Sequence, residues 1–235
     1  MKDKIEISLD LYGNFACFTR PYMKLDRVTY DVITPSAARG ILCSILCKPK
    51  KFYYEITKIE IMNEIKHIDI KKNELKDGKI KMDTKQDDIL SIYREDDITQ
   101  KNNRYLKDVY YRIYANIVKM PEYQYRSDEN ILTFKREFDR CVNYGKCKKQ
   151  PYFGTKECIC YFEPVNTQKY ALQKNIDFGI CLYDIFDITK NTILDKKNKD
   201  DVVNITFYHA IAENGVITIP PFNEIIKGGT AQYDW

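Results

Sequence analysis

Basic side chains that could bind phosphate are concentrated in two short runs of the sequence. The first run sets four lysines against Glu55: Lys48, Lys50, Lys51 and Lys58. The second run sets six basic side chains against Glu137 and Asp139: Lys135, Arg136, Arg140, Lys146, Lys148 and Lys149. The whole chain, with 38 basic and 34 acidic side chains, has a net charge of only +4. We therefore expect phosphate binding to come from these local patches, and the alternative for each is an ordinary solvated face.

A lysine-rich loop between two glycines belongs to the second run. Gly145 and Gly154 bound a segment that contains Lys146, Lys148 and Lys149. Glycine lets the backbone come close to a phosphate, and the ammonium groups would neutralise the phosphate charge. The loop is therefore a predicted phosphate-binding site, with a solvated turn as the alternative.

Thr34-Pro35-Ser36 marks the start of a predicted helix. Thr34 is a good N-cap, Pro35 suits the first helical position, and apolar residues then recur on one face. The free N–H groups at such a helix end favour phosphate, and Arg39 follows one turn later. A plain N-cap explains Thr34 and Pro35 but not Arg39. We therefore predict phosphate contacts at Thr34, Ser36 and Arg39.

Residues 109–117 alternate between apolar and polar side chains, which predicts a strand. Its polar face carries Tyr110, Arg112 and Tyr114. Aromatic and guanidinium groups on a sheet can stack with unpaired bases. The alternative is that this face packs against a second layer of the protein.

The predicted helices and strands that would position these residues indicate an α+β protein. A strand over 5–11, the helix from Thr34 and a strand over 54–61 suggest a split ferredoxin-like unit. Residues 71–108 are rich in charge and poor in apolar residues, so we expect a projecting hairpin or loop. A helix is expected from an N-cap at Asp128, with Ile131, Phe134 and Phe138 facing inward. Strand candidates at 158–163, 178–183, 203–208 and 215–219 make the C-terminal third β-rich.

The sequence lacks the apolar region of a signal peptide near Met1, and its longest apolar stretch, 41–47, is too short for a membrane span. We therefore expect a cytoplasmic protein without a membrane partner. In such a reducing compartment the eight cysteines are expected as free thiols. The favoured interpretation is that the cysteines pack as small buried hydrophobic residues. The alternative is a structural zinc site that uses four of them: Cys141, Cys147, Cys158 and Cys160.

Several stretches, in order between about residues 5 and 163, resemble the type I-C Cas-five family of CRISPR-associated RAMP proteins. The longest is Tyr30-Asp31-Val32-Ile33-Thr34-Pro35-Ser36-Ala37-Ala38-Arg39-Gly40-Ile41-Leu42. The others are Phe18-Thr19-Arg20-Pro21, Lys48-Pro49, Lys72-Asn73-Glu74, Leu106-Lys107-Asp108-Val109-Tyr110-Tyr111 and Gln150-Pro151-Tyr152-Phe153-Gly154, which leads to Glu157-Cys158.

This resemblance implies a ferredoxin-like (RRM-like) N-terminal domain over 1–145, with a thumb inserted at about 71–108, and a β-rich part over 146–235. It implies cleavage of precursor CRISPR RNA beside the repeat stem-loop, without a metal or other cofactor, by attack of a ribose 2′-OH on its own phosphate. It also implies that the protein stays on the 5′ handle of the crRNA. There it would join the backbone and large subunits of a type I-C Cascade complex, which contacts target DNA, and the thumb would pin a nucleotide against a neighbouring subunit.

The sequence departs from this family at the expected catalytic positions. Leu46 stands where the resemblance places a catalytic tyrosine, and Glu129 and Asn130 stand where it places a Lys-His pair. Either other groups near the same cleft cut the RNA, or the chain only binds it. For the first alternative the candidates are Tyr53, Tyr54 and Lys135. The predicted RNA-binding residues are Thr34, Ser36, Arg39, Lys48, Tyr110, Arg112, Arg136, Lys146, Lys148 and Lys149.

Overall fold

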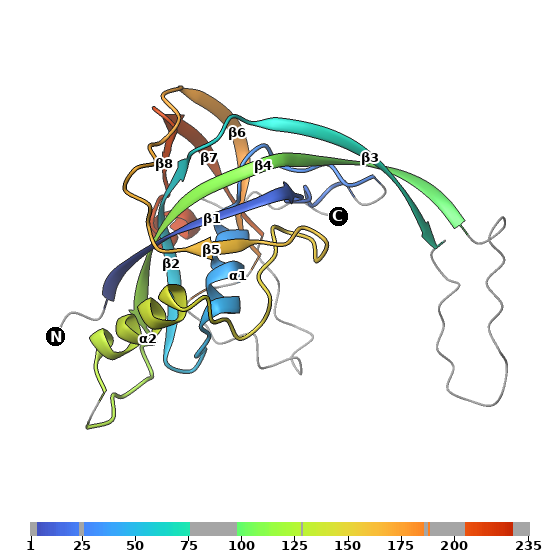
Figure 1. The fold of residues 1–235 in the computed structure, drawn as a ribbon. Coiled ribbons are helices and arrows are strands. Elements are labelled where there is room, and N and C mark those ends of the chain that lie inside the picture. The colour runs from blue at the N-terminus through green and yellow to red at the C-terminus, as the bar shows by residue number, and fades with distance from the viewer. Residues whose placement is uncertain are drawn as a thin grey trace, which may run out of the picture.

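The computed structural model describes residues 4–23, 26–75, 98–127, 129–185, 188 and 205–227. One antiparallel sheet of eight strands runs through this part of the chain, in the order β5-β1-β4-β2-β8-β7-β6, and β3 pairs with a further part of β4 (Figure 1). The strands are β1 Lys4–Ala16, β2 Phe52–Ile61, β3 Lys66–Leu75, β4 Ile98–Lys119, β5 Tyr161–Glu163, β6 Ile176–Asp184, β7 Thr206–Glu213 and β8 Val216–Thr218. The helices are α1 Pro35–Ile45, α2 Ile131–Asn143 and α3 Phe222–Lys227.

The centre of the sheet is the pairing of β1 with β4, which places Asp10 opposite Arg112. Alternate residues of each strand face opposite sides of the sheet, as the polar–apolar pattern predicts. The predicted inner face of the 109–117 strand is buried: Val109, Tyr111, Ile113, Ala115 and Ile117. The sheet therefore has one apolar face and one polar face along these strands.

Helices α1 and α2 cover the apolar face and contact each other. Thr34 caps α1 by accepting a hydrogen bond from the Ala37 N–H (3.2 Å), as the sequence predicts. The predicted cap of the second helix is wrong. Asn130, not Asp128, caps α2, because its side chain and that of Thr133 form a reciprocal capping box. The predicted inward residues of α2 are buried: Ile131, Phe134 and Phe138.

β3 and the first half of β4 form a two-stranded ribbon that extends away from the rest of the molecule (Figure 1). It contains residues 71–75 and 98–108 of the segment that the sequence predicts to project, and residues 76–97 of that segment lie outside the described residues. About halfway along it, Asn103 is buried and its side-chain oxygen accepts a hydrogen bond from the Arg27 N–H (2.9 Å). The ribbon is thus attached to the loop that follows β1.

The C-terminal third is β-rich, as predicted, and its strands extend the same sheet. β8 pairs with β2, and β7 and β6 follow it. β5 lies at the opposite edge and pairs with β1. No described helix is long and apolar enough to cross a membrane.

Candidate nucleic-acid interface

Four predicted RNA-binding cations are exposed on α2 and the loop that follows it: Arg136, Lys146, Lys148 and Lys149. The backbone of this loop already has hydrogen-bond partners. The N–H groups of Lys148 and Lys149 donate to the Ser44 carbonyl (2.9 and 3.0 Å) at the C-terminal end of α1. The predicted backbone contacts to phosphate are therefore wrong for these two residues, and only their ammonium groups are available to a ligand.

Gly154 has a packing role that the sequence does not reveal. Its φ is +83°, and a Cβ there would lie 2.0 Å from the Cys17 carbonyl oxygen. The Cys17 N–H also donates to the Phe153 carbonyl (3.0 Å). Glycine is required at this position because two backbone segments cross closely. The predicted role in approaching a phosphate is not needed to explain it.

The N-terminal end of α1 is occupied by a carboxylate of the same chain. Arg39 donates to both oxygens of Asp184 through Nε (2.7 Å) and Nη2 (2.8 Å), and the Ser36 hydroxyl donates to the same group (3.3 Å). Thr34 is buried as the N-cap. Asp184 therefore already takes the place of an anion at Ser36 and Arg39, and the phosphate contacts of Thr34, Ser36 and Arg39 stay a prediction.

A groove of about 510 Å³ runs beside the exposed side of α1. Small side chains form its helical wall, and an added Cβ at Gly40 would meet nothing within 4 Å. The opposite wall includes Arg27 and Tyr152, and the Tyr152 side chain is 40% exposed. This groove offers room for a nucleotide chain on the same side of α1 as Ser36 and Ser44.

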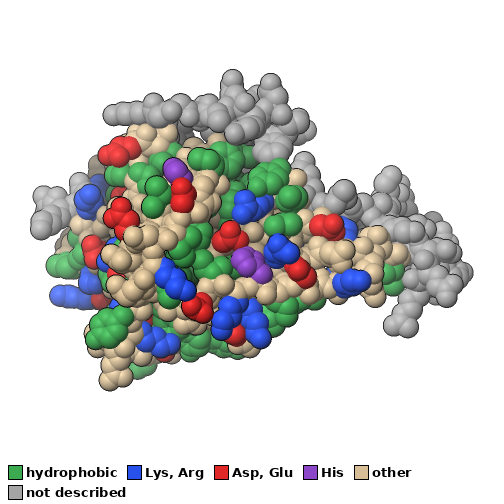
Figure 2. Space-filling model, turned by 90° about the horizontal axis from the view of Figure 1, so that it is seen from above, with side chains coloured by type: hydrophobic (Ala, Val, Ile, Leu, Met, Phe, Trp, Pro, Cys, Tyr) green, Lys and Arg blue, Asp and Glu red, His purple; other side chains and the backbone are tan. Residues whose placement is uncertain are grey.

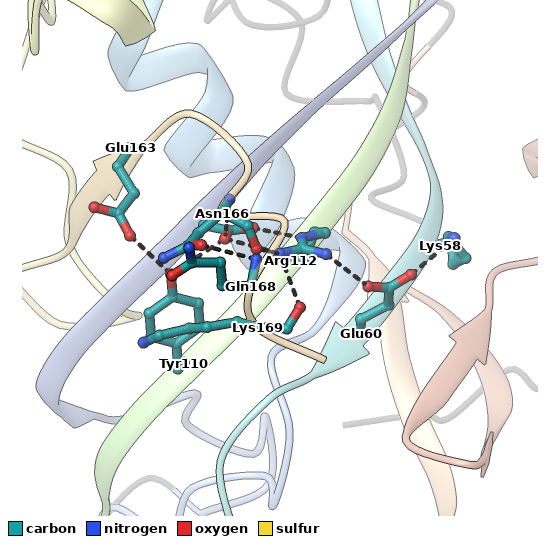
Figure 3. A network of polar contacts seen from close by, with 9 residues as sticks. Lys58, Glu60, Tyr110, Arg112, Glu163, Asn166, Gln168 and Lys169 are labelled. Atoms are coloured by element: carbon teal, nitrogen blue, oxygen red, sulfur yellow. Dashed lines mark hydrogen bonds and ion pairs between the residues drawn. The ribbon is translucent and has the colours of Figure 1, made fainter. Parts of the chain in front are cut away.

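The polar face of β4 is covered rather than open (Figure 3). Arg112 is buried and donates to Asp10 through Nε (2.7 Å) and Nη2 (3.1 Å), and its Nη2 also donates to the Asn166 carbonyl (2.6 Å). The Tyr110 hydroxyl lies within hydrogen-bond distance of carboxylate oxygens of Asp10 (3.1 Å) and Glu163 (2.8 Å). Burial is the main cause that raises the pKa of Tyr110 well above its usual value.

The predicted stacking platform is therefore wrong for Tyr110 and Arg112, and the alternative of packing against a second layer is confirmed. The segment that covers them lies near Asn166 and Lys169, whose Nζ sits 3.5 Å from the centre of the Tyr110 ring. Tyr114 remains half-buried beneath Lys58, whose Nζ lies 3.7 Å from its ring centre. Sequence reasoning missed Asp10. It lies on the polar face of one predicted strand and Arg112 lies on the polar face of another, and this arrangement indicates a cross-strand pair.

Tyr53 and Tyr54 point to opposite faces of β2. Tyr54 is 1% exposed, and its hydroxyl donates to the Leu46 carbonyl (2.7 Å). Burial raises the pKa of Tyr54 well above its usual value. Tyr53 is half-buried near Lys4 and Glu55, on the face of β2 away from α1 and α2. The predicted role of Tyr54 as the reacting phenol is wrong because substrate cannot reach it.

Lys48 and Lys135 already have carboxylate partners. Lys48 lies 2.5 Å from the carboxylate of Glu137 on α2. Lys135 donates to the Glu6 carbonyl (3.1 Å) and lies 3.6 Å from Asp139. Both ammonium groups remain partly exposed, so they stay predicted contacts whose charge is shared with an internal partner.

A further cluster, formed by Lys51, Tyr123 and Glu129, lies beside α2. The Lys51 Nζ donates to Oε1 of Glu129 (2.6 Å), and the Tyr123 hydroxyl donates to Oε2 of the same carboxylate. The hydrogen bond from Lys51, with a second one from Tyr123, lowers the pKa of Glu129 to about 2. Sequence reasoning missed this cluster because its members come from three separate segments with no recognisable spacing.

The four cysteines of the zinc alternative do not form a metal site in the part of the chain that the structure describes. No group of three or more His, Cys, Asp or Glu side chains that could hold a metal occurs among the described residues. Cys160 is buried, whereas Cys147 is exposed. Burial raises the pKa of Cys158 and of Cys160, which keeps both thiols protonated.

Side chains of both signs are interspersed on the face that Figure 2 shows, so this face has no extended area of one charge. On this face the basic side chains therefore form only small local clusters. The groups described above provide two: the exposed cations of α2 and its following loop, and the cluster at Lys51.

Comparisons with known proteins agree with the whole fold. The Cas5d family model, described as a CRISPR-associated protein, matches residues 6–220. A protein of Mannheimia succiniciproducens named CRISPR pre-crRNA endoribonuclease Cas5d is 35% identical over 229 residues, covering 92% of this chain and 95% of that protein. A protein of Thermus thermophilus with the same name is 32% identical over 179 residues, covering 76% of this chain and 72% of that protein.

Among solved structures, one titled "Crystal Structure of CRISPR-associated Protein" has a TM-score of 0.65 and 22% identity. The similarity covers 94% of this chain and 95% of that one, so the β-rich fold is shared over nearly the whole length. The residues that the family model matches include the cation-bearing helix α2. The chain therefore belongs to the Cas5d family of CRISPR-associated proteins.

Proposed function

We propose that this chain is a pre-crRNA endoribonuclease that binds CRISPR repeat RNA and cuts it. The observation that carries this proposal is the match to the Mannheimia relative of that name, at 35% identity over 95% of the relative's length. Because the match covers nearly all of the relative, this chain has a counterpart to nearly every segment of that protein. The activity is accordingly expected of this chain itself.

The proposed reaction is attack of a ribose 2′-OH on the adjacent phosphate, which leaves a 2′,3′-cyclic phosphate and a 5′-OH. It needs a base for the 2′-OH proton, an acid for the leaving oxygen and a cation for the phosphorane, and each acid or base step is worth roughly 10²–10⁴-fold. Tyrosine, lysine and glutamate side chains beside α2 have the chemistry for these tasks. The reaction does not require a metal.

The RNA would lie against the exposed cations Arg136, Lys146, Lys148 and Lys149, which follow one another along α2 and its loop. The groove beside α1 continues this surface, because the same loop caps the C-terminal end of that helix. After cleavage the protein would keep the 5′ handle. It would then act as a subunit of a type I-C surveillance complex with backbone and large subunits, and contact target DNA through that complex.

A ferredoxin-like unit over 1–145 and a β-rich part over 146–235 remain the proposed organisation. The order β5-β1-β4-β2, with α1 between β1 and β2 and α2 between β4 and β5, supports the first unit. β5 pairs with β1, so this unit would also take a strand from beyond residue 145. The ribbon formed by β3 and β4 would be the thumb.

The test is incubation of the purified chain with its own repeat RNA in EDTA. We expect a single cut with a 2′,3′-cyclic phosphate end, and no cut when the ribose at that position is 2′-deoxy. Intact RNA in both EDTA and Mg²⁺ would contradict the proposed activity. A cut in the deoxy substrate would contradict the proposed mechanism alone.

A second candidate function is RNA binding without cleavage. It is favoured by Leu46, Glu129 and Asn130 at the positions where the family resemblance places a tyrosine and a Lys-His pair. This alternative predicts tight binding of the 5′ handle, uncut repeat RNA and a separate processing ribonuclease encoded nearby. The same cleavage assay distinguishes the two functions.

A further inference from the structure

Three titratable side chains from different parts of the chain meet beside the N-terminal end of α2. Lys51 precedes β2, Tyr123 follows β4, and Glu129 stands before the cap of α2. Each oxygen of the Glu129 carboxylate takes one partner: Lys51 at Oε1 (2.6 Å) and Tyr123 at Oε2. All three side chains are half-buried, so they are held in place and remain reachable from solvent.

The surroundings of this triad, Lys51–Glu129–Tyr123, favour an anion. Lys48 and Lys51 both lie against the Phe134 ring, with Nζ 5.7 and 5.9 Å from its centre. The Lys119 Nζ donates to the Tyr123 carbonyl (3.0 Å). Lys48 is paired with Glu137 and Lys51 with Glu129, and Lys119 adds a third positive charge beside the Tyr123 backbone. A phosphate group entering here would balance it.

We propose that Tyr123 and Lys51 are the catalytic base and acid for ribose 2′-OH attack in this chain, with Glu129 as the positioning residue between them. This inference rests on the proposed endoribonuclease function and assigns it a site. A phenol and an ammonium group fixed on one carboxylate form the base–acid pair that the reaction needs. The triad would take the place of the tyrosine and the Lys-His pair that the family resemblance implies, and it does not use Leu46, Tyr53 or Tyr54.

The protons balance through the two observed hydrogen bonds. The 2′-OH proton moves to the Tyr123 oxygen as the phenolic proton moves to Glu129, and the 2′-oxygen forms its bond to phosphorus. The bond from phosphorus to the 5′-oxygen breaks, and that oxygen takes a proton from Lys51. Glu129 then returns its proton to the Lys51 Nζ. The products are a 2′,3′-cyclic phosphate and a 5′-OH, and the protein is restored.

If the Lys51–Glu129 ion pair were only structural, it would need the positive charge of Lys51 but no transfer of a Lys51 proton. It would also need no phenol on the second carboxylate oxygen. The variants Lys51→Arg, Tyr123→Phe and Glu129→Gln separate these roles. Arginine keeps the charge but does not release a proton near neutral pH. Phenylalanine keeps the ring packing, and glutamine keeps a hydrogen-bond acceptor.

The experiment is single-turnover cleavage of the cognate repeat RNA by the full chain, with binding affinity and thermal unfolding measured on the same samples. We expect each of the three variants to bind RNA within about twofold of wild type and to cut roughly 10²–10⁴-fold more slowly. Two matched controls should cut at the wild-type rate. Tyr125→Phe removes a neighbouring phenol that packs on the same Phe134 ring, and Glu64→Gln breaks a separate lysine–glutamate pair (2.7 Å to Lys174).

A chemical rescue gives a readout that a structural role would not move. In a substrate with sulfur in place of the bridging 5′-oxygen, the leaving group needs no proton. Lys51→Arg should then cut at a rate close to wild type, whereas Tyr123→Phe should remain slow because the 2′-OH still needs a base.

The outcomes separate the inference from the function on which it rests. If wild type cuts and the three variants cut within about threefold of it, the triad is not the site, and the endoribonuclease function stands. If the sulfur substrate rescues Tyr123→Phe and not Lys51→Arg, the assigned roles are wrong. If wild type binds the RNA and never cuts it, both the function and the inference are overturned.

Discussion

At the scale of single residues, several of the charged groups that the sequence predicts as ligands already have internal partners. Arg39 is bound by Asp184, Arg112 by Asp10 and Lys48 by Glu137. The two arginine pairs are largely buried, and buried ion pairs fix positions rather than add much stability, but removal of one partner is costly. These arginines are therefore expected to affect folding before they affect RNA binding.

Arg112→Met should destabilise the protein by about 3–5 kcal/mol, because it leaves the fully buried Asp10 carboxylate without its main partner. Urea unfolding followed by circular dichroism would measure the change. The matched control is Arg104→Met, which removes a cross-strand pair of the same bidentate geometry, 2.8 and 3.1 Å to Asp69, on the exposed ribbon. We expect a far smaller change there, and equal effects of the two variants would contradict the role of burial.

Acid should weaken the attachment of the 119–129 segment. The pKa of Glu129 is about 2 in the folded protein against an ordinary value of 4.5, so its contribution to stability is complete above about pH 4.5 and is lost as the pH falls toward 2. Glu129→Gln should flatten the stability profile across that window. Urea midpoints at several pH values would measure this, with Tyr125→Phe as a control that keeps the wild-type slope.

Local residue roles could be predicted and distant partners could not. Thr34 as a cap and Phe134 as a core residue follow from neighbouring positions in the sequence. Arg39 meets Asp184 across 145 positions, and Lys51 meets Glu129 across 78. No spacing rule connects these partners, whereas Asp10 and Arg112 lie on the polar faces of two predicted strands. The candidate site therefore had to be corrected from the structure.

At the scale of elements, apolar periodicity predicted α1, β1, β2 and the centre of β4. It did not predict that β4 begins at Ile98, because residues 98–107 pair with β3 through backbone hydrogen bonds while only Asn103, Tyr105 and Leu106 among them are buried. Periodicity reports burial, and a ribbon that buries little gives a weak pattern. The composition of the segment gave the better indication that it projects.

Gly154→Ala should destabilise the loop after α2. The new methyl group would lie 2.0 Å from the Cys17 carbonyl oxygen, at a φ of +83° that side chains disfavour. The control is Gly145→Ala, where φ is +61° and nothing lies within 4 Å, so that only a conformational cost of about 1–2 kcal/mol applies. Thermal unfolding should give a clearly lower midpoint for Gly154→Ala than for Gly145→Ala. The reverse order would contradict the close backbone crossing.

At the scale of the whole molecule, a net charge of +4 means that RNA binding depends on where the cations lie rather than on how many there are. The resemblance to the Cas-five family, noted on short motifs, was confirmed by matches over most of the length. The strand order was beyond the sequence, because β5 and β8 are only three residues long and carry too little pattern to choose a partner.

Neutralising the loop lysines should reduce the salt dependence of RNA binding. Each phosphate contact on a single strand adds about 0.7 to the slope of log affinity against log salt concentration, so the triple change of Lys146, Lys148 and Lys149 to Gln should lower it by up to about 2. Fluorescence anisotropy between low and moderate salt would measure this. Lys174→Gln, whose charge is paired with Glu64, should leave the slope unchanged. An unchanged slope in the triple variant would show that RNA does not reach the loop.

The pairing of β1 with β4 affects how the chain folds during translation. Asp10 finds Arg112 only 102 positions later, and at roughly 5–20 residues per second a ribosome takes about 5–20 s to supply the partner strand. During that interval the first strand exposes unpaired hydrogen-bonding groups and an apolar face, and both invite mispairing. Nascent chains arrested shortly before residue 98 should accordingly be digested readily by protease. Chains arrested far enough beyond residue 119 for β4 to leave the exit tunnel should resist it, so shielding by a chaperone would matter most before that point.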